Sequence, residues 1–180
     1  MKFYLAPCIF LVCMACTEVS FKEPQPKDIK ELSEIPAKLL GVYQTENKGN
    51  SYGEIEVFSR GYRILKENDQ GSSEEYTLSD SLVVKHYKGY YFVNIRDDGV
   101  WILRVVKREK NGNLILMEMP ALSENAEKRN EQLTELRKIA PVIETEVNGM
   151  RQFIMEPSPR QLLQLIKKGY FKEQTYLKRK

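Results

Sequence analysis

Residues 90–117 read YYFVNIRDDGVWILRVVKREKNGNLILM, and this stretch decides the fold. It contains three apolar and aromatic runs whose side chains alternate with period two, which is the spacing of a β-strand. Asp97-Asp98-Gly99 separates the first two runs, and Asn111-Gly112 separates the second from the third. Both turn sequences supply the positive-φ residue that a tight reversal needs. The stretch therefore predicts two consecutive antiparallel hairpins.

The same pattern continues on both sides of this stretch. Residues 54–57 alternate Glu-Ile-Glu-Val, which places Ile55 and Val57 on one face. Residues 142–147 and 152–155 flank Asn148-Gly149 and predict a further hairpin. Shorter runs occur near Tyr43 and at residues 62–66 and 82–87. About eight or nine short strands result, and we expect a mainly β fold, an antiparallel meander forming a small barrel or a strongly curled sheet.

Two packing helices are expected, at residues 123–140 and 158–168. Ser123 is the predicted N-cap of the first helix, and Pro141 ends it. Ser158 followed by Pro159 starts the second helix, and Gly169 ends it. The predicted inward-facing residues are Ala126, Leu133, Leu136 and Ala140 in the first helix and Leu162, Leu163 and Ile166 in the second.

The first 16 residues, MKFYLAPCIFLVCMAC, have the pattern of an export signal. A single positive charge, Lys2, precedes an apolar run of about 13 residues, which is shorter than the ~20 residues that a helix needs to cross a bilayer. All three cysteines, Cys8, Cys13 and Cys16, lie in this segment, so the sequence after it carries no disulfide framework.

Residues 12–16, Val-Cys-Met-Ala-Cys, resemble the lipobox of bacterial lipoproteins, with Cys13 where the family usually has Leu. The resemblance implies cleavage before Cys16, lipid attached to its sulfur, and membrane anchoring in the cell envelope. Thr17 stands where an Asp commonly retains such proteins at the inner membrane, which favours the periplasmic side of the outer membrane. The alternative is an ordinary secretory signal, or an uncleaved anchor, that merely contains cysteine.

The 180 residues suffice for one hydrophobic core, and 42% hydrophobic with 29% charged residues is a globular composition. We divide the chain into a signal peptide (1–15), a lipid-anchored flexible tether (16–36) and a single β-rich domain (37–180). The tether is polar and carries Pro24, Pro26 and Pro36. As flexible coil, it would reach about 25 Å.

The residue types that carry most enzyme chemistry are scarce. His86 is the one histidine, and lipid on Cys16 would leave the mature chain without a thiol. The sequence contains neither a Gly-x-Ser-x-Gly elbow nor a phosphate-binding loop. The adjacent carboxylates Asp97-Asp98 and Glu74-Glu75 lie by predicted turns, where acidic residues occur for backbone reasons. We therefore assign no catalytic, cofactor-binding or metal-binding residue.

Two further features bear on partners. Residues 160–180 hold seven Lys and Arg against Glu173 alone, which indicates either an anionic partner or a solvated tail beside a helix end. Tyrosines 87, 90 and 91 surround Gly89 and indicate either core packing or a binding surface. Nucleic acid is not an expected ligand of an exported protein.

Gly41-Val42-Tyr43 resembles the Gly-x-Trp opening of lipocalin-like barrels, with Tyr in place of Trp. The whole layout, from lipobox through a Pro-rich tether to a β domain, resembles small bacterial lipoproteins of unassigned function. We expect a membrane-tethered, non-enzymatic domain that binds a small apolar ligand or an envelope protein. The alternatives are a carboxylate-based glycan or ester hydrolase and a structural subunit of an envelope complex.

Overall fold

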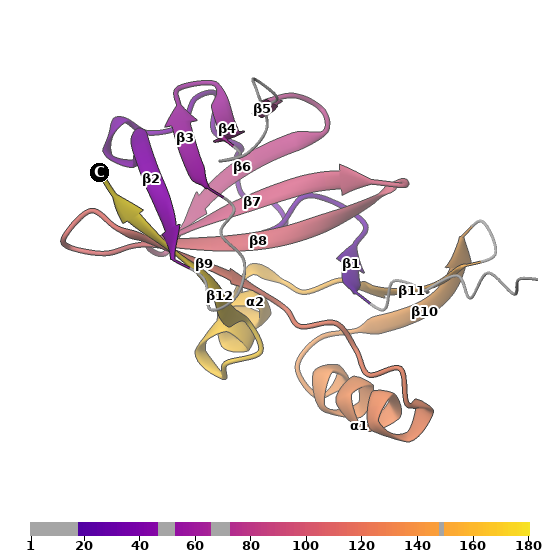
Figure 1. Cartoon of the computed structure of the whole chain (residues 1–180). Coiled ribbons are helices and arrows are strands. Elements are labelled where there is room, and N and C mark those ends of the chain that lie inside the picture. Colours follow the sequence, from indigo (N-terminus) through magenta and orange to yellow (C-terminus); the bar gives the residue numbers. More distant parts are fainter. Residues whose placement is uncertain (1–17, 47–52, 66–72, 148–149) are drawn as a thin grey trace, which may run out of the picture.

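The computed structural model describes residues 18–46, 53–65, 73–147 and 150–180 (Figure 1). As predicted, this part of the chain is mainly β, with two α-helices. The helices are α1 (Ala126–Arg137) and α2 (Pro159–Lys167), and a short 3-10 helix spans Ala37–Leu39. The strands are β1 (Val19–Phe21), β2 (Gly41–Glu46), β3 (Glu54–Phe58), β4 (Gly61–Leu65), β5 (Ser73–Thr77), β6 (Leu82–Tyr87), β7 (Tyr90–Asp97), β8 (Val100–Arg108), β9 (Leu114–Glu118), β10 (Val142–Val147), β11 (Met150–Met155) and β12 (Lys172–Arg179).

The two central hairpins are confirmed as β7–β8 and β8–β9. Asp97 pairs with Val100, so the first turn consists of Asp98 and Gly99, whose φ angles are 42° and 84°. Two successive positive φ values are those of a type I′ turn, whose twist matches that of the flanking strands. The third hairpin, β10–β11, is confirmed by its pairing, and its turn residues 148–149 lie outside the described residues.

The strands form one large mixed sheet in the order β10-β11-β1-β8-β9-β12-β2-β3-β4-β5, with β7 and then β6 on the other edge of β8. The parallel pair in it is β1 with β11. Because β10, β5 and β6 each end a row of pairings, the described strands are not closed into a barrel. Figure 1 shows β2 to β5 turned over β6 to β8, so the sheet bends strongly.

The centre of this sheet is buried on both faces. On one face, Phe92 and its cross-strand partner Val105 are fully buried in a core shared with α1 and α2. On the other face, Tyr91 and its partner Val106 belong to a second cluster. As predicted, Ile55 and Val57 lie together, and both pack against this second cluster.

Chain preceding β2 fills the inner side of the bend. Ile35 and Leu39 are buried there against Tyr43, whose side chain is fully buried and whose Oη donates a hydrogen bond of 2.8 Å to the Leu39 carbonyl. The Ile35 amide donates to the Ser59 carbonyl. These residues therefore fasten the β3–β4 turn to the rest of the fold.

Residues 18–36, predicted to be part of a flexible tether, are instead packed against the sheet. Val19 and Phe21 are buried, and β1 pairs with both β8 and β11. We call residues 22–36, which follow β1, the N-terminal strap. The strap runs along the edge of β6, where the Leu32 amide donates to the Val84 carbonyl. The folded body therefore includes these residues.

The helices agree with the sequence in number, and α1 is shorter than predicted at both ends. α2 begins after Ser158, which forms a reciprocal capping box with Gln161, and Gly169 follows it with φ of 76°. The N-cap of α1 is Asn125, two residues after the predicted Ser123, and α1 ends at Arg137 rather than at the predicted residue 140. The Ser123 hydroxyl instead accepts a bond from the Asn125 amide. Leu133 and Leu136 are buried as predicted, and Ala126 is exposed.

The basic C-terminal segment is also a strand. β12 lies between β9 and β2, with Thr175 and Leu177 buried. The Arg179 guanidinium donates to the Leu40 carbonyl, and the Arg179 backbone amide donates to the side-chain oxygen of Asn113. The interpretation of this segment as a solvated tail is therefore wrong.

Candidate functional site

The lipid-attachment residue predicted from sequence, Cys16, lies outside the described residues. His86 is exposed on β6, with its ring 4.6 Å from that of Tyr91 on β7. Asp97 ends β7 and Asp98 is the first residue of the β7–β8 turn, so both lie by a turn as expected. Glu74 and Glu75 instead lie within β5, where Glu75 pairs with Arg63 at 2.7 Å. The structure brings these groups into no common site among the residues it describes.

No group of three or more His, Cys, Asp or Glu side chains in the described residues is arranged to hold a metal ion. No described helix is long and apolar enough to cross a membrane. Tyr91 is buried in the second cluster, and Tyr87 and Tyr90 pack against the core on the other face of the sheet, which favours packing as the role of these tyrosines.

The structure instead concentrates buried polar groups where the strap meets β6 and β7. Asn94 on β7 is fully buried. Its Oδ1 accepts a hydrogen bond of 2.6 Å from the Gln25 amide, and its Nδ2 donates one of 2.8 Å to the Gln25 carbonyl. A single side chain thus satisfies both backbone groups of a residue 69 positions away, in place of a strand partner.

Lys85 on β6 holds the strap at a second point. Its Nζ donates to the carbonyls of Pro24 at 2.8 Å and of Pro26 at 3.1 Å, and Lys85 is only 8% exposed. Burial lowers the pKa of Lys85, and the carboxylates of Glu23, Glu31 and Asp28 partly oppose this effect. The ammonium group is therefore a structural clamp on the strap.

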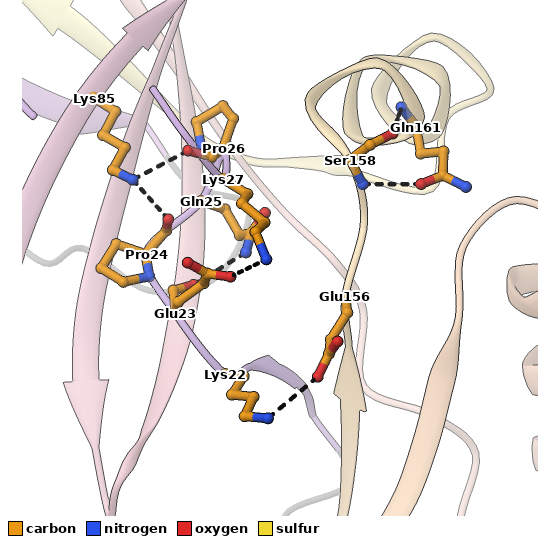
Figure 2. Close-up of polar contacts among 10 residues, drawn as sticks. All are labelled: Lys22, Glu23, Pro24, Gln25, Pro26, Lys27, Lys85, Glu156, Ser158 and Gln161. Carbon is orange, nitrogen blue, oxygen red and sulfur yellow. Dashed lines mark hydrogen bonds and ion pairs between the residues drawn. The ribbon is translucent and has the colours of Figure 1, made fainter. Parts of the chain in front are cut away.

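A cavity of about 290 Å³ separates this part of the strap from the start of α2. We call it the Gln25 pocket, and Figure 2 shows the side chains around it. Lys22 lies 3.9 Å from Glu156, and Lys27 lies 3.0 Å from Glu23. The hydrogen bond and charge of Glu23 raise the pKa of Lys27. The lining residues are Lys22, Glu23, Gln25, Lys27, Pro141, Glu156, Pro157, Ser158 and Gln161.

A second and larger cavity, of about 420 Å³, lies between α1 and the end of α2. We call it the helix pocket. Its lining is mostly apolar, with charged residues from α1 on one side and from the segment after α2 on the other. The lining residues are Met119, Pro120, Leu122, Glu131, Gln132, Glu135, Leu136, Lys168, Gly169, Tyr170 and Lys172.

No family model, curated protein or solved structure matches this chain significantly. Sequence reasoning missed both pockets. Two amide side chains in the sequence could have drawn attention to the strap. Gln25 lies between two prolines, and Asn94 lies in an otherwise apolar run.

Proposed function

We propose that this chain is a lipid-anchored, non-enzymatic domain of a bacterial cell envelope that binds a small apolar ligand in the helix pocket. The observation that carries the proposal is the pocket itself. Its volume of about 420 Å³ lies in the range of pockets that hold small molecules, and such pockets are mostly apolar with a few polar groups.

The walls of the helix pocket suit a ligand with an apolar body and a polar end. Leu122 and Leu136 are buried beside it, and Tyr170 adds a partly exposed ring. Lys168 and Lys172 lie on the side formed by the chain after α2. An apolar ligand body would be removed from water against the leucines, while a polar end would remain at the charged rim.

In this proposal the bent sheet is a scaffold rather than the ligand compartment. Its inner side already holds Ile35 and Leu39, packed against Tyr43. A lipocalin-like barrel, as predicted from the sequence, would hold its ligand on that inner side. The helix pocket lies on the opposite side of the sheet, beside the core shared with the helices.

The proposed anchor would hold this body close to the membrane. Thr17 and Glu18 alone separate Cys16 from Val19, the first residue of β1, and the three steps from Cys16 to Val19 would span about 10 Å in extended chain. In this proposal the folded body would begin about 10 Å from the lipidated residue, rather than the 25 Å expected for a flexible tether. Two or three acyl chains on Cys16 would make the attachment persistent.

The anchor is tested by replacing Cys16 with Ser in the bacterium that produces the protein. We expect the wild-type chain to incorporate labelled palmitate and to sediment with membranes, and Cys16→Ser to lose the label. A wild-type chain that never takes up label would refute the lipoprotein part of the proposal.

The ligand is tested by purifying the protein from membranes, extracting it with organic solvent and analysing the extract by mass spectrometry. Glu135→Trp places a large side chain at the wall of the helix pocket, and Thr134→Trp is the matched control at the neighbouring exposed position, outside the lining. We expect a compound that accompanies the wild type and Thr134→Trp and is depleted from Glu135→Trp. Equal recovery from all three proteins would refute ligand binding in this pocket.

A further inference from the structure

Two arginine side chains meet where β8 and β12 end. Arg108 is the last residue of β8, and Arg179 is the last residue of β12. A Cβ at Gly112, in the turn that follows β8, would lie 3.7 Å from Arg108 Nη2 and 3.8 Å from Arg179 Nη1. Both nitrogens therefore lie within 4 Å of one point. We call Arg108 and Arg179 the arginine pair.

Backbone carbonyls hold both guanidinium groups in place. Arg108 Nε donates to the Lys38 carbonyl at 3.0 Å, and Arg108 Nη1 donates to the Glu109 carbonyl at 3.3 Å. Arg179 Nη2 donates to the Leu40 carbonyl at 2.9 Å. These bonds leave Arg108 Nη2 and Arg179 Nη1 without a partner among the described residues. The arginine pair is therefore oriented in advance and still has N–H donors to offer.

No carboxylate in the described part of the chain forms an ion pair with either arginine. Glu109 follows Arg108 in the sequence, but its carboxylate accepts a hydrogen bond of 2.9 Å from the Tyr176 hydroxyl. Glu54 pairs instead with Lys180. Two like charges that are held side by side without a counterion repel each other, and a bound anion would remove this repulsion.

Other observations agree that positive charge gathers here. Burial raises the pKa of Tyr43, and the charges of Arg179 and Arg108 partly oppose this rise, so both charges act on the same hydroxyl. Lys38, whose carbonyl holds Arg108, has its ammonium 5.7 Å from the centre of the Tyr91 ring and forms no ion pair with a described residue. The basic C-terminal segment thus contributes Arg179 to a local group of cations.

The geometry of the arginine pair suits a phosphate group. The planar fork of a guanidinium matches the oxygens of a phosphate, and charge-assisted bonds of this kind are about 2.7–2.9 Å long. Two nitrogens that lie within 4 Å of one point can each donate to a different oxygen of the same phosphate. A phosphate monoester also carries close to two negative charges at neutral pH, which matches two arginines, whereas a carboxylate carries one.

We propose that the arginine pair binds a phosphate monoester. Arg108 Nη2 and Arg179 Nη1 donate to two of the phosphate oxygens, and the phosphate replaces the missing carboxylate partners. A soluble ester and a lipid headgroup present this same chemistry. The site shares no residue with the lining of the helix pocket, so phosphate binding is independent of the apolar ligand.

The test is a titration of glycerol 3-phosphate into the ¹⁵N-labelled purified protein, followed by NMR at constant ionic strength. We expect saturable shifts of the Nε–H signals of Arg108 and Arg179 and of the Gly112 backbone amide. Glycerol, which lacks the phosphate, should shift none of these signals. Sodium chloride that shifts them as much as the ester would show charge screening in place of a site, and would overturn the proposal.

Vesicles distinguish the two sources of the phosphate. Co-sedimentation is compared between vesicles of phosphatidylcholine alone and of phosphatidylcholine with phosphatidic acid, so that a lipid anchor contributes equally to both. Extra binding to phosphatidic acid that Arg179→Met abolishes would support a lipid headgroup. Saturable binding of glycerol 3-phosphate without this extra binding would support a soluble ester. No response to either probe would overturn the proposal.

Arg60→Met is the matched control for Arg179→Met. Both arginines are exposed, and each donates to a backbone carbonyl, that of Leu40 for Arg179 and that of Ser33 for Arg60. Affinity for glycerol 3-phosphate should fall at least about tenfold in Arg179→Met and less than about twofold in Arg60→Met, which changes only the distant charge. Equal losses in the two variants would overturn the proposal.

A conservative variant separates binding from folding. Arg179→Lys keeps the positive charge and lacks the planar fork, so its affinity for the ester should lie between those of the wild type and Arg179→Met. Urea midpoints in phosphate-free buffer show that each variant is folded, and the Arg108 Nε–H signal still reports binding. An affinity in Arg179→Met equal to that of the wild type would overturn the proposal.

Discussion

Asn94 bonds to both backbone groups of Gln25, accepting from its amide at 2.6 Å and donating to its carbonyl at 2.8 Å. The Nδ2 of Asn94 also bonds to the carbonyls of Val83 and Phe92, at 3.2 Å each. One fully buried side chain therefore joins the strap to β6 and β7.

Replacing Asn94 with Leu should destabilise the protein by about 2–4 kcal/mol, because the Gln25 amide and carbonyl would be buried without partners. The measurement is urea unfolding followed by the fluorescence of Trp101, which is the single tryptophan and pairs with Phe21 of β1. Asn130→Leu on the exposed surface of α1 is the matched control and should change stability by less than about 0.5 kcal/mol. Equal stability of the two variants would contradict the role of Asn94.

The strap should resist proteolysis. Trypsin can cut after Lys22, Lys27 and Lys30, and all three side chains are exposed, yet the backbone between them is held by Asn94 and Lys85. We expect cleavage at these lysines to be at least about tenfold slower in the folded protein than in urea, since cleavage requires local opening. Mass spectrometry of the peptides gives the rates. Cleavage at the same rate in both states would contradict an ordered strap and support the flexible tether predicted from the sequence.

Lys85→Met should destabilise the protein by about 1–3 kcal/mol at neutral pH, because the carbonyls of Pro24 and Pro26 lose their shared donor. Lys30→Met, which replaces an exposed lysine of the same strap, is the control. Both variants are measured by urea unfolding. An unchanged unfolding free energy in Lys85→Met would show that the clamp contributes nothing.

The same variant predicts a pH dependence. Burial lowers the pKa of Lys85 below its ordinary value of 10.5 in the folded state, so the unfolded chain binds more protons between these two pKa values. Stability relative to Lys85→Met should therefore rise with pH through this window and level off above 10.5. A difference that falls over the same range would contradict the direction of the shift.

Gly61 should be far less replaceable than Gly89. A Cβ at Gly61 would lie 1.9 Å from the Tyr76 carbonyl oxygen on β5, so β4 and β5 would have to separate. Gly61→Ala should cost about 3 kcal/mol or more. At Gly89, φ is 86° and a Cβ would have no neighbour within 4 Å, so Gly89→Ala should cost about 1–2 kcal/mol for its backbone conformation alone. Similar urea midpoints for the two variants would refute this difference.

The parts of the fold that were predicted correctly are those whose signals are local. Asp98-Gly99 sets its own turn, and the alternation on either side sets the faces of β7 and β8. The Ser158-Pro159 start of α2 is equally local, since the cap bonds to a residue three positions away. These features depend on short-range sterics and hydrogen bonding, which the sequence displays directly.

The parts that were missed depend on distant partners. β1 is only three residues long, and the prolines and charges after it are typical of a coil. Asn94 and Lys85, about 60 to 70 positions further along the chain, hold these strap residues in place by hydrogen bonds. β12 was missed because its charged residues conceal the buried positions Thr175 and Leu177, whose partners lie on β9 and β2. The Gln25 pocket depends on the same long-range arrangement.

The placement of β1 has a mechanical consequence. β1 runs parallel to β11 on one side and antiparallel to β8 on the other, so it has a neighbouring strand on each edge. A pull on the chain ahead of Val19, along the direction of the strand, would load the hydrogen bonds on both edges of β1 in shear. Bonds loaded in this way must break together rather than one at a time. If the chain were held at Cys16 as proposed, drag on its body would be borne by the hydrogen bonds that join β1 to β8 and β11.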